Sequence, residues 1–157
     1  MSFEKAIEFA LKWEGGYINH PDDPGGETNF GISKRAYPSL DIANLTEEQA
    51  KEIYRRDYWD KCGCNSLPEP EDLIVFDTAI NMGIGRALKL GVATSCFNKG
   101  LQPLVKSQSQ QSVTLDWRDY LFRRIEFYNQ FNKPMFLKGW INRVLALYKE
   151  ALKAYDH

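Results

Sequence analysis

Residues 15–31 interrupt an otherwise helical sequence pattern with five glycines and two prolines. A helix does not extend easily through such a segment, because each Gly costs about 1 kcal/mol and each Pro about 3 kcal/mol relative to Ala in a helix interior. Short β-prone pieces, 17–19 and 28–30, flank the turn residues 20–26. Two such pieces separated by turn residues indicate a hairpin. We therefore predict one small β-hairpin with a long loop near the N-terminus.

The rest of the sequence is helical in pattern. The first helix is predicted to begin after Ser2, a good N-cap residue, and to run through Trp13. Thr46 and Gln49 have the spacing of a capping box, which opens a second helix through about residue 59. After a proline-containing connector, apolar residues at helical spacing predict four more helices, at 71–82, 86–97, 113–131 and 135–155. The predicted fold class is mainly α (α+β), a helical bundle with one small N-terminal β-hairpin.

The length of 157 residues suits one compact domain, 1–157, because a chain of this size can bury a working core. We expect approximate sub-lobes at 1–66, which carries the hairpin, and 67–157, which is helical. Hydrophobic residues make up 43% of the chain and charged residues 26%, which is ordinary for a globular domain. Aromatic residues reach 13%, a level seen both where rings pack a core and where sugar or base rings are stacked.

Charge and hydropathy exclude several classes of partner. Lys and Arg total 20 against 21 Asp and Glu, a net charge of −1, so we expect no nucleic-acid partner. The longest aliphatic-aromatic run, 73–76, is far shorter than the roughly 20 residues that span a bilayer, so we expect no stable membrane insertion. Residues 1–11 lack a basic run followed by an apolar stretch, which predicts synthesis in the cytoplasm without a signal peptide. We expect a monomer.

The cysteines and histidines indicate no metal site. Cys62, Cys64 and Cys96 form an odd set, for which reduced thiols are expected. A site built from Cys62, Cys64 and one of the two histidines, His20 and His157, would lack the two-residue spacing of zinc knuckles. We therefore expect no metal ligand set.

Glu14 breaks the apolar pattern of the first helix. Phe3, Ile7 and Ala10 define one face at about 100° per residue, and Glu14, eleven residues after Phe3, falls within that face. Burial and the negative end of the helix dipole both favour the protonated form of such a carboxyl group. A carboxyl group that stays protonated near neutral pH can act as a general acid. The alternative is that the helix frays near Trp13 and Glu14 points to solvent.

The segment after Glu14 offers further polar groups. Two glycines permit a sharp turn, and a returning hairpin can bring Asp22 and Asp23 back over the helix end, with Thr28 in the second strand. Two carboxyl groups with a water between them are the minimum equipment for glycosidic hydrolysis with inversion. The alternative is an Asx-Pro turn whose aspartates only cap local amide groups.

Three blocks follow one another in order over about twenty residues: Glu14-Gly15-Gly16-Tyr17, Asp23-Pro24-Gly25-Gly26 and Thr28-Asn29-Phe30-Gly31-Ile32-Ser33. In order and spacing they resemble the signature of glycoside hydrolase family 108, the N-acetylmuramidases related to bacteriophage lysozymes. Residues 53–59, 76–83 and 139–143 resemble later parts of the family, including the small helical region often labelled peptidoglycan-binding.

The resemblance implies a lysozyme-like fold that cleaves the β-1,4 bond between N-acetylmuramic acid and N-acetylglucosamine in bacterial peptidoglycan. It implies that Glu14 is the catalytic acid, and that Asp23 and Thr28 position or activate a water on the opposite face of the sugar. Hydrolysis by this route inverts the anomeric centre and needs no metal or organic cofactor.

Three further residues are candidates for substrate binding. Asp77 and Asn81 are four residues apart on a predicted helix, so they share a face and can project together toward acetamido or hydroxyl groups. The resemblance favours this use, and the alternative is that both satisfy polar groups between packed helices. Tyr17, next to Glu14 on the hairpin, is the predicted sugar contact, whereas Trp140 is expected in the core.

These observations together predict a peptidoglycan hydrolase, in particular a phage-type endolysin that acts on the cell wall after release from the cytoplasm. Two alternatives stay open. In a lytic transglycosylase the C6 hydroxyl of the sugar attacks and a single acid suffices. A non-catalytic wall-binding or secretion-associated module would keep the fold without the chemistry.

Overall fold

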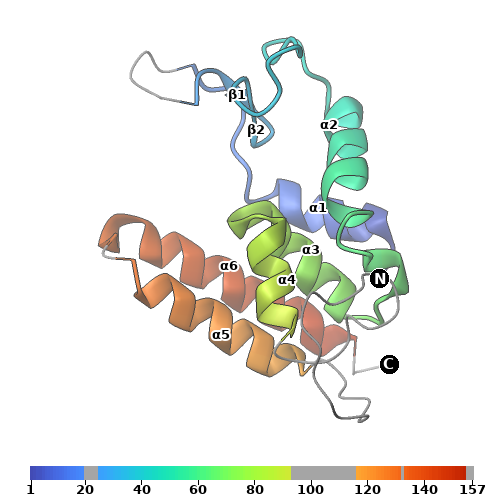
Figure 1. Cartoon of the computed structure of the whole chain (residues 1–157), viewed down its shortest axis with the longest axis vertical. Coiled ribbons are helices and arrows are strands. Elements are labelled where there is room, and N and C mark those ends of the chain that lie inside the picture. Colours follow the sequence, from blue (N-terminus) through green and yellow to red (C-terminus); the bar gives the residue numbers. More distant parts are fainter. Residues whose placement is uncertain (20–24, 93–115, 132, 155–157) are drawn as a thin grey trace.

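The computed structural model describes residues 1–19, 25–92, 116–131 and 133–154 (Figure 1). Within these residues the chain forms six α-helices, two short strands and two irregular helical turns. They are α1 (Phe3–Leu11), β1 (Thr28–Asn29), β2 (Ile32–Ser33), α2 (Glu47–Tyr54), the π-helical turn η1 (Arg55–Trp59), the 3-10 turn η2 (Cys64–Ser66), α3 (Glu71–Met82), α4 (Ile84–Val92), α5 (Trp117–Asn129) and α6 (Pro134–Lys153). The prediction of a mainly α chain with one small hairpin is confirmed.

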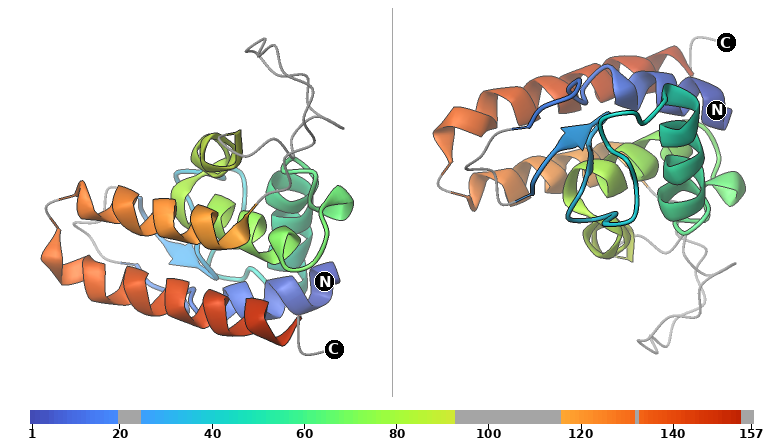
Figure 2. Two further views of the ribbon diagram at one scale, coloured as in Figure 1. Left: turned by 90° about the horizontal axis from the view of Figure 1, so that it is seen from below. Right: turned by 90° about the horizontal axis from the view of Figure 1, so that it is seen from above.

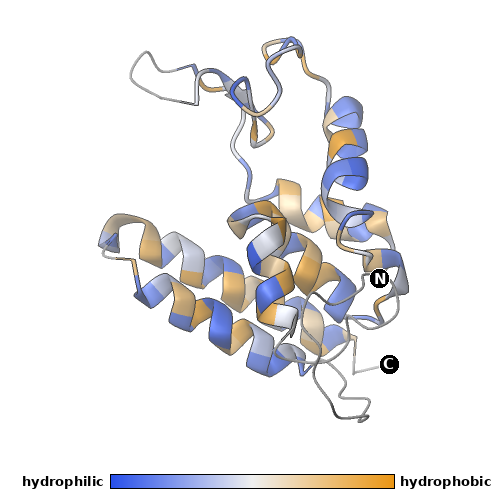
Figure 3. Ribbon diagram, in the orientation of Figure 1, coloured by the Kyte–Doolittle hydropathy of each residue, from blue (hydrophilic) through white to orange (hydrophobic). Residues whose placement is uncertain are grey.

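Helix α3 lies at the centre of the molecule. It contacts α1, α4, α5 and α6, and its residues 71–79 are all buried. A helix that is apolar on most sides belongs in the interior, since it has no face to expose to water. Helices α5 and α6 lie side by side, while the hairpin and α2 project to one side of the helical bundle (Figures 1 and 2). Apolar and hydrophilic residues alternate around α5 and α6, as expected for helices with one face on the core (Figure 3).

The predicted helix starts are confirmed where capping residues defined them. The side chain of Ser2 accepts a hydrogen bond from the Lys5 amide at the start of α1. Thr46 and Gln49 form the full capping box, each side chain bonding the other's backbone amide. Capping satisfies amide groups that the first helical turn leaves without partners. The helix predicted at 71–82 coincides with α3.

Helix ends without such signals are less well predicted. Helix α1 ends at Leu11 rather than Trp13, and the π-helical turn η1 replaces regular α-helix in the stretch before Trp59. Helix α4 begins at Ile84, two residues before the predicted start, and α5 begins at Trp117, after Asp116 caps it. The predicted continuations at 93–97 and 113–115 lie outside the described residues.

The predicted strand pairing is wrong in part. The sequence predicts that residues 17–19 pair with 28–30, but only a single antiparallel bridge, Ile18 to Thr28, joins them. Strand β1 pairs instead with β2, so that Asn29 faces Ile32 across a two-residue turn. Phe30 and Gly31 both have positive φ, 49° and 75°, as tight hairpin turns require. This short turn brings β1 and β2 together at a lower entropy cost than the longer loop does.

Aromatic side chains hold the N-terminal helix on the bundle. The rings of Phe3, Trp59 and Phe76 pack edge to face, with centroids 5.2 to 5.8 Å apart. Trp59 and Trp117 are buried, whereas Trp140, which the sequence predicts in the core, is half-buried. Edge-to-face aromatic pairs add about 0.5–1.5 kcal/mol beyond the area they bury. This cluster therefore fixes the position of α1 relative to α3.

Cys62 and Cys64 are buried, free thiols, as expected, and Cys96 lies outside the described residues. In the described part of the chain, no helix combines the length and the apolar character that a membrane crossing requires.

Candidate active site

Glu14 lies three residues after the last residue of α1. The amides of Trp13 and Glu14 donate to the carbonyls of Ala10 and Leu11, so the last turn tightens and does not fray. The Glu14 side chain is 19% exposed. This burial disagrees with the alternative in which Glu14 points freely to solvent.

The turn between β1 and β2 packs against the Glu14 carboxylate. A Cβ atom placed on Gly31 would lie 2.6 Å from Glu14 Oε2 and 2.6 Å from the hydroxyl of Tyr54. Only a glycine allows the backbone to approach these two oxygens so closely, and its φ of 75° also favours glycine. Gly31 thereby sets the distance between the hairpin and the acid.

Tyr54, from the end of α2, fixes the turn. Its hydroxyl donates a hydrogen bond of 2.8 Å to the carbonyl of Phe30. Burial and the neighbouring charge of Glu14 raise the pKa of Tyr54 far above its ordinary value. The hydroxyl therefore remains a proton donor, and it holds the hairpin in place next to Glu14.

Arg143, from α6, binds Glu14 from the other side. Its Nη1 donates to Glu14 Oε1 at 2.8 Å, and its Nε donates to Asp77 Oδ1 at 2.9 Å. The Arg143 side chain is only 6% exposed. Burial acts to lower the pKa of Arg143, but the charges of Asp77 and Glu14 outweigh it and the pKa is raised. The apolar surroundings expected for Glu14 are therefore wrong in part, because a guanidinium lies against one of its oxygens.

Asp77 is completely buried between two arginines. Its Oδ1 lies 2.8 Å from Nη2 of Arg143, and its Oδ2 accepts a 2.8 Å hydrogen bond from Nη1 of Arg124. Arg124 also donates to the hydroxyls of Thr78 at 3.0 Å and Tyr128 at 2.8 Å. Buried charges are stable only when paired in this way, since removing one partner leaves another uncompensated. The network joins α3, α5 and α6, and Glu14 contacts it through Arg143 of α6.

Three further predicted site residues, Tyr17, Thr28 and Asn81, lie within the described part of the chain. Tyr17 is 47% exposed and its hydroxyl donates to Glu27 Oε2 at 3.2 Å. Thr28 is half-buried in β1, where its backbone exchanges two 2.8 Å hydrogen bonds with Ile18. Asn81 is partly exposed and accepts a 2.5 Å hydrogen bond from Tyr128.

The structure thus brings Glu14, Asp77 and Asn81 into one hydrogen-bonded network through arginine and tyrosine side chains. Asp77 has no exposed surface with which to contact a sugar. Asp22 and Asp23 lie outside the described residues.

Three residues of the site received no role from the sequence: Gly31, Tyr54 and Arg143. All three fall in stretches that carry the family resemblance, 28–33, 53–59 and 139–143. Periodicity could not single them out, because Arg143 is 129 residues from Glu14 and Tyr54 is 24 residues from the carbonyl that it binds.

Comparisons with known proteins agree with this arrangement. The family model for glycosyl hydrolase 108 matches residues 7–83, which include Glu14, the hairpin and α3. The solved structure of SagA from Brucella abortus is similar over 96% of this chain and 94% of its own, with 30% sequence identity and a TM-score of 0.74. The chain belongs to glycosyl hydrolase family 108. Among curated proteins, none matches it significantly.

Membership of the family confirms two predictions. The resemblance drawn from the three glycine-rich blocks was correct, and the fold is lysozyme-like. The protein is therefore a glycoside hydrolase. Arg124 and Arg143 lie beyond the stretch that the family model matches.

Proposed function

We propose that this glycoside hydrolase is a muramidase that cleaves the β-1,4 bond between N-acetylmuramic acid and N-acetylglucosamine of peptidoglycan, with Glu14 as general acid. The observation that carries the proposal is the position of Glu14, held between the Gly31 turn and Arg143 at the end of α1. A positioned carboxyl group of this kind can protonate the glycosidic oxygen as the bond breaks.

The geometry assigns different roles to the two oxygens of Glu14. Oε1 accepts from Arg143 and is therefore occupied by a donor. The proton that is transferred consequently belongs on Oε2, which faces Gly31. The absent side chain of Gly31 lets the turn lie next to Oε2 without a clash, and Arg143 fixes the rotation of the carboxyl group. Both effects favour the alignment that proton transfer needs.

Arg143 is held in turn by Asp77, which engages its Nε and Nη2 and leaves Nη1 for Glu14. We assign Asp77 as a positioning residue that acts through Arg143, in place of the sugar contact expected from the sequence. Tyr17 remains the proposed sugar contact on the hairpin side, because its ring is exposed next to Glu14 in the chain.

The second half of the reaction is assigned to Asp23 and Thr28, which position and activate the attacking water. The bridge between Ile18 and Thr28 closes the base of the segment that contains Asp23. A carboxylate separated from the acid by room for a water gives inversion. We propose that the α-anomer is the first product and that the protein acts as a monomer, as an endolysin that reaches the wall after release.

Digestion of purified sacculi tests the proposal. Released fragments are reduced with borohydride and their ends are identified by mass, while proton NMR follows the anomeric centre of fresh product. We expect muramic acid at the reducing ends and the α-anomer first. Reducing-end N-acetylglucosamine would contradict the bond assignment, 1,6-anhydro ends would identify a transglycosylase, and binding without any release would identify a non-catalytic module.

A further inference from the structure

The turn between α5 and α6 presents apolar side chains to solvent. Met135 is 83% exposed, the highest value among the large apolar side chains that the structure describes, and Phe136 and Phe131 are 52% and 43% exposed. Lys133 and Lys138 are exposed beside them. We call these five residues the α5–α6 tip, which lies at the far end of the helix pair from the N-terminus (Figures 1 and 2). None of the functions assigned above uses this tip.

Neighbouring side chains hold the exposed rings of the tip in place. Phe136 stacks on Trp140 with ring centroids 6.0 Å apart, and Phe131 packs edge to face against both Phe127 and Trp140. Pro134 is the first residue of α6, where its fixed φ already suits the first helical turn. The tip is therefore a preformed projection, and its rings lose little conformational freedom when they bind a surface.

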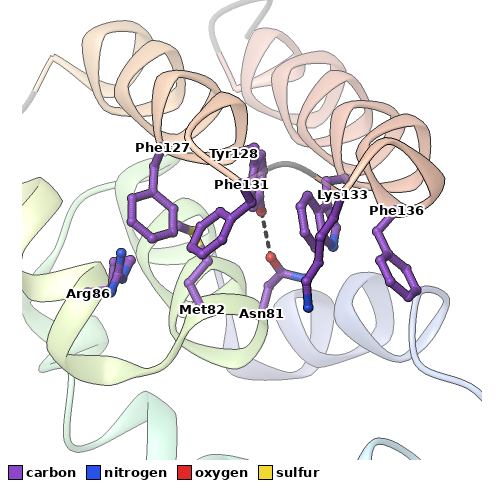
Figure 4. A pocket seen from close by; sticks show the side chains of 9 residues that line it. Asn81, Met82, Arg86, Phe127, Tyr128, Phe131, Lys133 and Phe136 are labelled. Carbon is purple, nitrogen blue, oxygen red and sulfur yellow. Dashed lines mark hydrogen bonds between the residues drawn. The ribbon is translucent and has the colours of Figure 1, made fainter.

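The charge around the tip is positive. Residues 127–149 contain no Asp or Glu, although the whole chain has 21 acidic residues and a net charge of −1. The side chain of Lys133 lies between the rings of Phe131 and Phe136, at a pocket of about 390 Å³ (Figure 4). The tip thus combines exposed apolar rings with interleaved cations, and the stretch of chain that forms it carries no anion.

An anionic lipid bilayer matches this combination. Interfacial segments bury Trp, Phe and other apolar side chains about 5–10 Å into the boundary between headgroups and acyl chains, with Lys and Arg toward anionic headgroups. Lys133 and Lys138 have long stems that can lie along apolar surface while their amines reach phosphate oxygens. A second copy of the chain is a poorer partner, since two tips in contact would bring their lysines together.

We propose that the α5–α6 tip docks the protein on the surface of an anionic lipid bilayer, with Met135 and Phe136 entering the interface and Lys133 and Lys138 pairing with lipid phosphates. The proposal is separate from the muramidase function, because it rests on exposed residues to which the reaction assigns no role. Met135 precedes Arg143 by eight residues on α6, or about 12 Å along the helix axis. Docking would therefore hold the candidate active site close to the membrane surface.

Flotation with lipid vesicles tests the proposal. The parent protein is mixed with vesicles of phosphatidylcholine, with or without phosphatidylglycerol, and the partition coefficient is measured from the bound fraction. We expect binding to the anionic vesicles to be stronger by about tenfold or more, and to weaken as the salt concentration rises. No binding by the parent, or equal binding to both kinds of vesicle, would overturn the proposal.

Two pairs of variants separate the tip from the rest of α6. We expect Met135→Asp and Lys133→Glu each to lower the partition coefficient about tenfold, because the first removes an inserted side chain and the second reverses a charge near the phosphates. Leu145→Asp and Lys149→Glu are the matched controls, since they introduce the same charges at exposed positions of α6 that lie ten and sixteen residues further along the helix. We expect these controls to bind within about twofold of the parent.

The same variants show which part of the proposal fails. Equal losses in Lys133→Glu and Lys149→Glu would indicate diffuse charge attraction and would overturn docking through the tip. Unchanged binding in Met135→Asp would overturn insertion of the apolar side chains. Both tip residues are exposed, so we expect each variant to keep the thermal transition of the parent. The milder Met135→Gln replaces Met135→Asp if the new charge disturbs folding.

Other partners for the tip, and failure of the muramidase function, give different results. Purified sacculi contain no bilayer, so we expect Met135→Asp and Lys133→Glu to cleave them at rates within about twofold of the parent. Loss of cleavage in both variants, with vesicle binding intact, would assign the tip to the wall instead. A parent dimer that Met135→Asp dissociates in ultracentrifugation, without vesicle binding, would identify a second copy as the partner. A parent that binds anionic vesicles but cleaves no sacculi would support the tip and overturn the muramidase function alone.

Discussion

Replacement of Gly31 by Ala should reduce activity far more than it reduces stability. The new Cβ atom would lie 2.6 Å from Glu14 Oε2, and ordinary contact begins at 3.4 Å, so the carboxyl group and the turn must separate by about 0.8 Å. Displacements near 1 Å in a catalytic group can cost about 10² in rate. We therefore expect kcat for sacculus cleavage to fall by about 10².

Gly63→Ala provides the control for backbone strain. Gly63 has a φ of 65°, close to the 75° of Gly31, and a Cβ atom there would meet nothing within 4 Å. An alanine in the left-handed region costs about 1–2 kcal/mol at either position, so both variants should lose several degrees of thermal stability. Only Gly31→Ala should lose activity. Equal activity in the two folded variants would refute the claim that Gly31 positions Glu14.

Two further predictions concern stability. Asp77→Asn should lower the free energy of unfolding by about 3–5 kcal/mol, because it leaves two buried guanidinium groups without their shared anion. As a control, Asp119→Asn removes an exposed ion pair and should lower the free energy of unfolding by less than about 1 kcal/mol. Similar shifts of the thermal transition in the two variants would contradict the stabilising role of the buried network. Hydrogen bonds from a neighbouring guanidinium, and further from a lysine and a tyrosine, hold the pKa of Asp57 well below its ordinary value despite partial burial. The contribution of Asp57 to stability should be present above about pH 4 and lost as the pH falls below that value. Urea unfolding curves of the parent and Asp57→Asn should therefore differ at pH 7 and converge in acid. A difference in unfolding free energy that grows in acid would contradict the lowered pKa of Asp57.

The parts of the fold that sequence predicts well are those that local chemistry determines. Ser2 and the Thr46–Gln49 capping box define helix starts because their side chains bond amides three residues away. Helix α3 is recognisable because its apolar residues occur on most sides of the helix, which indicates a helix buried in the core. Strand pairing is harder to predict, because β1 can pair with β2 through the short turn at Phe30 and Gly31 or with residues 17–19 through the longer loop.

The site can be predicted from the sequence only in its N-terminal part. Glu14 stands out because it is a carboxylate on an otherwise apolar helical face, and the glycine-rich blocks indicate the family. Arg143 reaches Glu14 only when α6 packs against α3, and no periodicity in either segment specifies that register. For Asp77, a polar residue on a buried helix face fits both a ligand contact and an internal ion pair. The contacts with Arg124 and Arg143 show that Asp77 belongs to an internal ion pair, and these arginines lie 47 and 66 residues away in the sequence.

The most direct test of the account is the rate at which the parent and Glu14→Gln release reducing-end muramic acid from purified sacculi. The amide preserves the volume of the side chain and can still accept from Arg143, but it has no acidic proton to donate. We expect a thermal transition close to that of the parent and a rate lower by 10² or more, since general-acid assistance contributes about 10² to 10⁴. A folded Glu14→Gln protein that cleaves sacculi within tenfold of the parent rate would contradict the assignment of Glu14 as the acid.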